Sequence, residues 1–276
     1  MPDAKARGID LRPTSSASSQ ERRLSEAYSR PVEHVAARHG LSLPPVPRTC
    51  VICHSSSMLD LATRSYPHED VDIGCVEPTS VHFCYPEEGL PFAVVRCSAG
   101  APMAALLLEE LIAVGFKRFI SVGSAAHPAG DKKPALPVGG VVIASQAYVY
   151  EGTSSHYRQS ARVSFPDEAS VQSLSELLTA NEIAHRVGAV ATTDAIYRET
   201  DRFRREVAEN GVLAIDMQLS AAFTVARFHG VEMVGLLYIS GIVGGDSGWG
   251  LEMANGRLLA VEERLFPLVM GHAASE

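Results

Sequence analysis

Short apolar runs alternate with longer amphipathic runs along the chain from about residue 50 onward. The short runs are rich in Val and Ile and have the length of buried strands, whereas the longer runs repeat apolar residues at helical spacing. Strands are predicted at 50–53, 92–97, 117–122, 141–150, 186–192 and 234–239, and helices at 103–114, 168–180, 217–229 and 253–270. This alternation is typical of an α/β domain whose sheet is largely buried.

The clearest predicted unit is strand 92–97, the helix that follows it, and strand 117–122. A turn of small residues at 98–101 separates the first strand from the helix, and Pro102 suits the first turn of that helix. A second loop of small residues is predicted at 123–126, directly after the next strand. Ligands of open α/β sheets bind where such loops gather at the carboxyl ends of strands, so both loops are candidate binding segments.

The start of the chain has a different composition from the rest. Residues 1–30 are polar and include the serine-rich run 14–19, which offers too little apolar surface to support folding. We therefore expect a mobile N-terminal arm over 1–30 and a folded domain over 31–276. A short helix is predicted at 32–39, and the prolines at 44–47 stiffen the entry to the first strand.

Composition and charge indicate which classes of molecule this chain binds. Of 276 residues, 46% are hydrophobic and 20% are charged, which suffices for one sizeable core. Lys and Arg number 24 against 32 Asp and Glu, a net charge of −8, and no basic cluster stands out. This argues against a nucleic-acid surface and favours a small-molecule ligand. No apolar run has the length of a membrane span or the form of a signal peptide, so we expect no membrane partner and a cytoplasmic location.

The number and spacing of the cysteines bear on disulfide formation, haem attachment and zinc binding. Their number is odd, five, and the motif from Cys50 to His54 has the C-x-x-C-H spacing of covalent haem attachment. The apolar residues inside that motif place it in a strand, and no second Cys/His pair at zinc-ligand spacing accompanies it. We therefore expect buried, reduced thiols, with no metal and no organic cofactor.

Four segments, in the same order, resemble those of the nucleoside phosphorylase and nucleosidase superfamily, in particular its uridine-phosphorylase-like bacterial branch. Segment 98–104 is similar to the family's G-x-G-x-P loop, 122–125 to V-G-[ST]-[ACT], 151–157 to E-G-T-S-x-H-Y, and 193–197 to the base-pocket segment. The tripeptide Asp216-Met217-Gln218 stands where the family has Glu-Met-Glu. The resemblance implies a single α/β domain with a central twisted mixed β-sheet flanked by helices.

The resemblance also implies a nucleoside pocket. Its substrate-binding residues would be Ser98, Gly100, Ser124, Thr193, Asp194, Tyr197, Arg202, Met217 and Gln218. Arg202 aligns with the Arg that holds a pyrimidine carbonyl in uridine phosphorylases. Each position also has a simpler structural interpretation: Gly100 suits a turn, Met217 a core, and Arg202 a solvated helix face.

Several charges of the family pocket are missing. Phosphorolysis needs a cationic cradle for phosphate, and the resemblance implies arginines in two places, where this chain has Ser121 and the loop that begins with His54 and Ser55. The family's second tripeptide Glu accepts hydrogen bonds from the ribose hydroxyls, whereas Gln218 can bond hydroxyls but carries no charge. We expect His54 and Ser55 to hold a weaker anion or a water, which makes hydrolysis easier to support than phosphorolysis.

Proton transfer to the leaving base has three candidate residues. Purine-acting relatives use an Asp after the late strand, where this chain has Gly241 or Ile242. The catalytic candidates are Asp216, Asp246 and His156. For Asp216 a helix N-cap role is equally natural, for Asp246 a surface turn, and for His156 a loop position.

The sequence leaves three functions open. The first is cleavage of the N-glycosidic bond of a nucleoside or modified nucleoside, by hydrolysis in preference to phosphorolysis. The second is a repurposed phosphorylase-fold enzyme of specialised metabolism that acts on a non-nucleoside small molecule, and the third is a catalytically inactive ligand-binding homologue. Family members assemble as dimers, trimers or hexamers, so the resemblance also implies a homo-oligomer.

Overall fold

The computed structural model describes residues 44–74, 79–128, 136–243, 249–251 and 256–275. The predicted N-terminal arm and the predicted helix at 32–39 lie outside these residues, as does the catalytic candidate Asp246. The description that follows concerns the compact unit that contains the predicted α/β domain.

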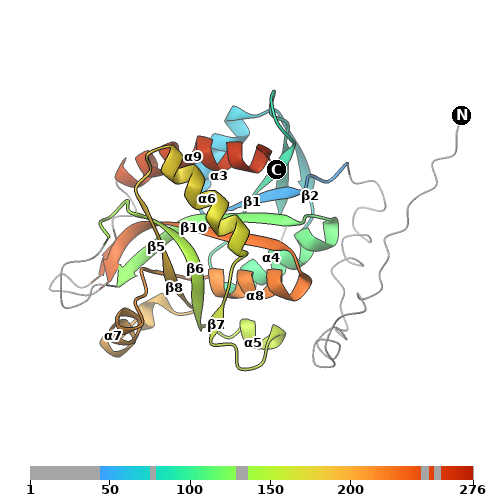
Figure 1. Ribbon diagram of the computed structural model, residues 1–276. Coiled ribbons are helices and arrows are strands. Elements are labelled where there is room, and N and C mark those ends of the chain that lie inside the picture. Colours follow the sequence, from blue (N-terminus) through green and yellow to red (C-terminus); the bar gives the residue numbers. More distant parts are fainter. Residues whose placement is uncertain (1–43, 75–78, 129–135, 244–248, 252–255, 276) are drawn as a thin grey trace, which may run out of the picture. The chain divides into compact units, whose positions relative to one another are not determined.

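The strands of this unit join into one mixed sheet (Figure 1). They are β1 (Thr49–Cys53), β2 (His68–Asp72), β3 (Ser80–Cys84), β4 (Phe92–Arg96), β5 (Arg118–Pro128), β6 (Val141–Tyr150), β7 (Val163–Ser164), β8 (His185–Thr193), β9 (Ala214–Asp216), β10 (Glu232–Val243) and β11 (Trp249–Leu251). Their order is β11-β10-β6-β8-β9-β5-β1-β4-β3-β2, with β7 paired to β6. An additional β10–β5 pairing closes β5, β9, β8, β6 and β10 into a ring.

Helices cover both faces of this sheet (Figure 1). They are α3 (Ser56–Ser65), α4 (Ala101–Val114), α5 (Ser154–Tyr157), α6 (Glu168–Ala180), α7 (Asp201–Glu209), α8 (Leu219–His229) and α9 (Gly256–Ser275), with a 3₁₀ turn, η1 (Ile196–Arg198). One core cluster packs α4 and α8 against the sheet, and a second packs α3, α6 and α9 against the opposite face. Each face of the sheet is therefore shielded by its own set of helices, as the α/β prediction requires.

Helix α4 follows the first candidate loop, and its sequence contains residues that favour a helix start and a helix end. α4 begins after Gly100, whose φ of 120° is a backbone conformation that glycine adopts without strain. Pro102 lies in the first turn of this helix. The helix ends at Gly115, whose φ is 128°. The predicted strand, turn and helix from 92 to 114 are confirmed, and the loop before α4 is held at the end of β4.

Two predicted boundaries are wrong. The predicted loop at 123–126 is part of β5, because Gly123 pairs with Leu237 of β10 and Ala126 pairs with Ile215 of β9. Pairing on both sides keeps this stretch extended although its small residues suit a turn. The helix predicted at 217 begins two residues later, at Leu219, because Asp216 ends a strand.

The β2–β3 hairpin was not predicted. β2 reads His-Glu-Asp-Val-Asp and only its Val is buried, so it lacks the apolar alternation that marks a strand.

The expectation of buried, reduced thiols is confirmed for the four cysteines that the structure describes, Cys50, Cys53, Cys84 and Cys97. No helix in the described part of the chain is long and apolar enough to cross a membrane.

Candidate functional site

Three neighbouring parallel strands bring two of the predicted binding loops together. β1 lies between β4 and β5 and runs parallel to both. Beyond the end of β1, the backbone amide of His54 donates to the Val122 carbonyl at 3.0 Å, and the amide of Cys97 donates to the Cys53 carbonyl at 2.9 Å. The loops after β1 and β4 therefore meet beside the middle of β5, where carboxyl ends of parallel strands commonly form ligand sites.

His54 forms a neutral pair with Ser121 at this edge. Its Nε2 lies 3.0 Å from the Ser121 hydroxyl oxygen. Burial lowers the pKa of His54 to about 4, against the opposing effect of a backbone hydrogen bond at Cys97, so the imidazole is uncharged at neutral pH. A Cβ at Gly123 would lie 3.0 Å from His54 Cδ2, so glycine there makes room for the imidazole.

Behind this loop, α9 supplies a buried carboxylate. Glu262 is 4% exposed and accepts hydrogen bonds from the hydroxyls of Ser57 and Tyr238. Ser55 caps α3 by accepting a bond from the Met58 amide at 3.3 Å. Ser55 is thus the N-cap of α3, and its role in holding a weak anion or a water stays a prediction.

A cavity of about 220 Å³ opens beside Ser98. It is lined by Leu59, Thr79, Ser80, His82, Arg96, Cys97, Ser98, Met103 and Leu107. Sequence reasoning missed Arg96, the last residue of β4, although a basic residue directly before a candidate loop was a usable signal. A guanidinium at this position can pair with an anion bound next to Ser98.

A second group of polar residues surrounds the start of α8. Asp216 is 3% exposed, and its two oxygens accept bonds from the Thr192 hydroxyl at 2.6 Å, the Gln218 amide at 3.0 Å and the Leu219 amide at 2.7 Å. Thr192 in turn accepts from the Ser220 amide at 2.9 Å. Burial raises the pKa of Asp216 to about 6, and these hydrogen bonds hold the pKa below what burial alone would give. The side chain of Asp216 therefore caps the first amides of α8, although the N-cap residue itself is Gln218.

The segment similar to E-G-T-S-x-H-Y borders the same helix. Glu151 accepts from the Ser220 hydroxyl at 2.9 Å, and Asp194, directly after β8, accepts from the Gly152 amide at 2.9 Å. Thr193 is 7% exposed. The fold thus brings Asp194 and Thr193 to the polar residues around the start of α8. His156, in contrast, is exposed on α5.

Gln218 is a buried amide directly before α8. It is 4% exposed, and within the described chain its side-chain oxygen is buried without a hydrogen-bond partner. Met217, beside it, is half-buried. A buried acceptor without a partner costs about 1 to 3 kcal/mol, which a ligand hydroxyl would recover.

The predicted base-binding residues lie further out. Tyr197 on η1 is 86% exposed, and Arg202 is exposed in the first turn of α7. Glu199 lies between them and was missed from the sequence. Burial raises its pKa to about 7, and one of its carboxylate oxygens is buried without a partner in the described structure. Its place in the polar stretch after β8 was the available signal, and a carboxyl of this pKa suits general acid catalysis.

Comparison with known proteins gives one family match and several relatives. The family described as the phosphorylase superfamily matches residues 48–266. A guanosine phosphorylase of Halorubrum lacusprofundi is 29% identical over 157 residues, 56% of this chain and 62% of the relative. A uridine phosphorylase of Thermococcus kodakarensis is 29% identical over 161 residues, 52% of this chain and 56% of the relative. The chain thus covers less than two thirds of the length of either.

Two solved structures share the fold. A uridine phosphorylase from Vibrio fischeri superposes with a TM-score of 0.68 at 21% identity and covers 83% of this chain and 92% of its own. A purine nucleoside phosphorylase from Toxoplasma gondii, in complex with immucillin-H, superposes with a TM-score of 0.71 at 16% identity, covering 83% and 91%. The mixed sheet flanked by helices is therefore the fold of these structures.

Proposed function

Since the chain belongs to the phosphorylase superfamily, we propose that it cleaves the N-glycosidic bond of a nucleoside or modified nucleoside with water as the nucleophile. The carbon–nitrogen bond breaks, a carbon–oxygen bond to water forms, and the proton released by water reaches the leaving base. The observation that carries the choice of water is the neutral pair of His54 and Ser121.

That pair occupies the two places where the family resemblance implies arginines. Phosphate is close to doubly charged at neutral pH, and an uncharged imidazole with a hydroxyl cannot balance it. The same two groups suit a water molecule, because each can donate and accept a hydrogen bond. Together with Ser55 at the start of α3, they form the proposed site of the nucleophile.

Sugar binding is assigned to Gln218 and Met217. The partnerless amide oxygen of Gln218 would accept a bond from a ribose hydroxyl. Asp216 positions that residue through the Gln218 backbone amide, and its occupied oxygens favour this capping role over proton transfer. Glu199 joins Asp246 and His156 as a proposed acid for the leaving base, because burial holds its pKa near neutrality.

Product analysis tests the proposal. Phosphate-free protein is incubated with a panel of purine, pyrimidine and modified nucleosides, with and without excess phosphate. We expect base release at the same rate in both conditions and free ribose as the second product. Base release that requires phosphate, with ribose 1-phosphate as the product, would refute the proposal that water is the nucleophile. Silence across the panel would favour the repurposed or inactive alternatives instead.

Gln218→Glu tests the sugar assignment within the same assay. A carboxylate beside the ribose stabilises the positive charge that builds on the sugar, so we expect faster cleavage, on the order of tenfold. Gln172→Glu, which places the same change on the exposed surface of α6, is the matched control and should leave the rate unchanged. Equal rates for both variants would remove Gln218 from the sugar site.

One observation favours phosphorolysis as the second candidate. Arg96 lines the cavity with Ser98 and could supply a single cation for phosphate. If cleavage requires phosphate, Arg96→Met should raise the KM for phosphate and leave the KM for the nucleoside unchanged. Arg64→Met, at the exposed end of α3, controls for loss of surface charge.

A further inference from the structure

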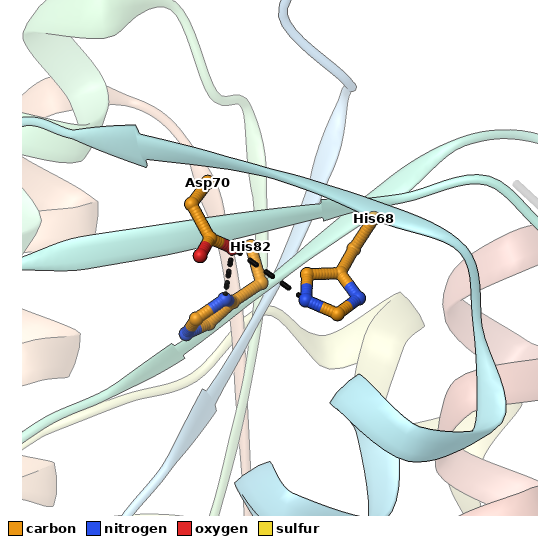
Figure 2. A group of neighbouring side chains, drawn as sticks. All are labelled: His68, Asp70 and His82. Carbon is orange, nitrogen blue, oxygen red and sulfur yellow. Dashed lines mark hydrogen bonds and ion pairs between the residues drawn. The ribbon is translucent and has the colours of Figure 1, made fainter.

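One face of the β2–β3 hairpin brings two imidazoles and a carboxylate together (Figure 2). Asp70 of β2 pairs directly with His82 of β3 across the antiparallel ladder. His68 lies two residues before Asp70, so alternation along the strand puts both on the same face. The three side chains meet there from two strands.

The spacing of the three side chains fits a metal ion. His82 Nδ1 lies 2.7 Å from Asp70 Oδ1, and His68 Nε2 lies 3.6 Å from the same oxygen. One ligand atom from each residue lies within 4.8 Å of the other two. Bonds of about 2.1 Å in tetrahedral geometry put ligand atoms about 3.4 Å apart, so small side-chain rotations would complete the coordination.

A backbone hydrogen bond orients the ring of His68. Its Nδ1 lies 3.0 Å from the Tyr66 carbonyl oxygen, which can only accept, so Nδ1 carries the hydrogen. The Nε2 of His68 then faces the Asp70 carboxylate at 3.6 Å and is the ring atom available to a bound ion. A backbone carbonyl that fixes the second ring nitrogen is also the usual outer support of a metal-binding histidine.

We propose that His68, Asp70 and His82 bind a divalent transition-metal ion of the Zn²⁺ type, with the fourth position open to water. Imidazole nitrogens select such ions over Mg²⁺ and Ca²⁺, which take oxygen ligands. Side-chain exposures of 27% for His68, 58% for Asp70 and 14% for His82 leave the ion a path from solvent.

The ion would tie two strands together at the end of the sheet. β2 is the last strand in the sheet order and pairs with β3. His82 also lines the cavity beside Ser98, so the ion would fix one wall of that cavity. Bound metal should therefore stabilise the hairpin.

A zinc titration of the full chain tests the proposal. Chelator-treated protein is titrated with Zn²⁺ in competition with a chromogenic chelator, with no nucleoside present. We expect one high-affinity ion per chain and a rise in Tm with Zn²⁺. His82→Asn and Asp70→Asn should each weaken binding at least tenfold. His229→Asn is the matched control, because it breaks another His–carboxylate pair, His229 with Glu109 at 2.9 Å, and should leave the Kd unchanged.

The absorption spectrum of bound Co²⁺ is a second test of the proposed site. Co²⁺ in place of Zn²⁺ should give visible absorption typical of tetrahedral coordination, and Asp70→Asn should abolish that absorption. Asp70→Asn keeps the shape of a largely exposed side chain, so it serves even if His82→Asn fails to fold. The site is refuted if the full chain binds no stoichiometric Zn²⁺, or if His82→Asn and Asp70→Asn bind the ion as tightly as His229→Asn does.

Discussion

Asp216 is buried and accepts hydrogen bonds from three donors. Burial raises its pKa, whereas the hydrogen bonds lower it. Burial is the larger effect and raises the pKa from 3.8 to about 6 in the folded chain. Because the folded pKa lies above the unfolded value, the folded chain binds more protons between these two pH values. The stability that this group contributes is therefore fully present below pH 3.8 and is lost as the pH rises through 6.

Asp216→Asn should reveal this linkage. The variant loses part of the α8 cap, so it should unfold more easily than the wild type at every pH. The difference in the free energy of unfolding should be larger at pH 5 than at pH 8 by about 1.5 kcal/mol, because only the wild type carries the titrating group. Urea denaturation at both pH values measures it, with Asp60→Asn on the exposed surface of α3 as the control. A difference that grows toward pH 8 would contradict the raised pKa.

At the scale of an element, β5 joins the two polar groups of the site. The stretch that was predicted as a loop pairs with β10, while Ala126 pairs with β9, whose last residue is Asp216. On the other side, β5 pairs with β1, which leads into His54. At Gly123 the side chain of His54 packs so closely that an added Cβ would lie only 3.0 Å from it.

Gly123→Ala tests that packing. A Cβ would lie 3.0 Å from His54 Cδ2 and 3.1 Å from its Cβ, so the loop after β1 must shift. We expect a loss of about 1 to 3 kcal/mol in unfolding free energy, as for other overpacked sites, together with a loss of nucleoside cleavage. Gly271→Ala in α9 is the matched control, because no atom lies within 4 Å of its added Cβ. The control should keep or slightly raise stability; equal effects of both changes would contradict the close contact.

At the scale of the whole described unit, the C-terminal helix reaches back to the first loop. Glu262 of α9 accepts bonds from Ser57 of α3 and Tyr238 of β10, so one buried carboxylate connects segments from both ends of the fold. α9 also packs its apolar face against the cluster that contains Met58 and Val51. The shape of the loop that begins at His54 thus depends on the last helix.

Glu262→Ala should therefore act on stability and on the loop together. Removal of the carboxylate leaves two buried hydroxyls without their acceptor, and we expect a loss of about 2 to 5 kcal/mol in unfolding free energy. Glu263→Ala changes the next, exposed residue and should stay within about 0.5 kcal/mol of the wild type. Thermal or urea denaturation gives both values. If the two variants are equally stable, Glu262 does not connect the three segments.

The homo-oligomer implied by the family resemblance remains a proposal for the whole molecule. Sedimentation equilibrium of the full chain would test it.

Much of the fold could be predicted because periodicity and turn residues are local. The strands around β1, β4 and β6 and the helix with Pro102 and Gly115 at its ends follow from patterns a few residues long. β2 and the middle of β5 could not be predicted, because pairing with distant strands keeps polar or small residues extended. Arg96 and Glu199 had only weak local signals, since their cavity contact and burial depend on neighbours remote in the chain.

The sequence by itself determined which charges are available: Gln218 and Ser121 stand where the family resemblance implies Glu and Arg. Only the tertiary structure decided how the remaining groups are used. It pairs His54 with Ser121 across 67 residues, commits one oxygen of Asp216 to Thr192 of β8 and the other to the start of α8, and sets Asp70 opposite His82. The physical reason is that residue identity fixes charge and hydrogen-bonding capacity, whereas strand register and burial fix which groups meet and which protons they keep.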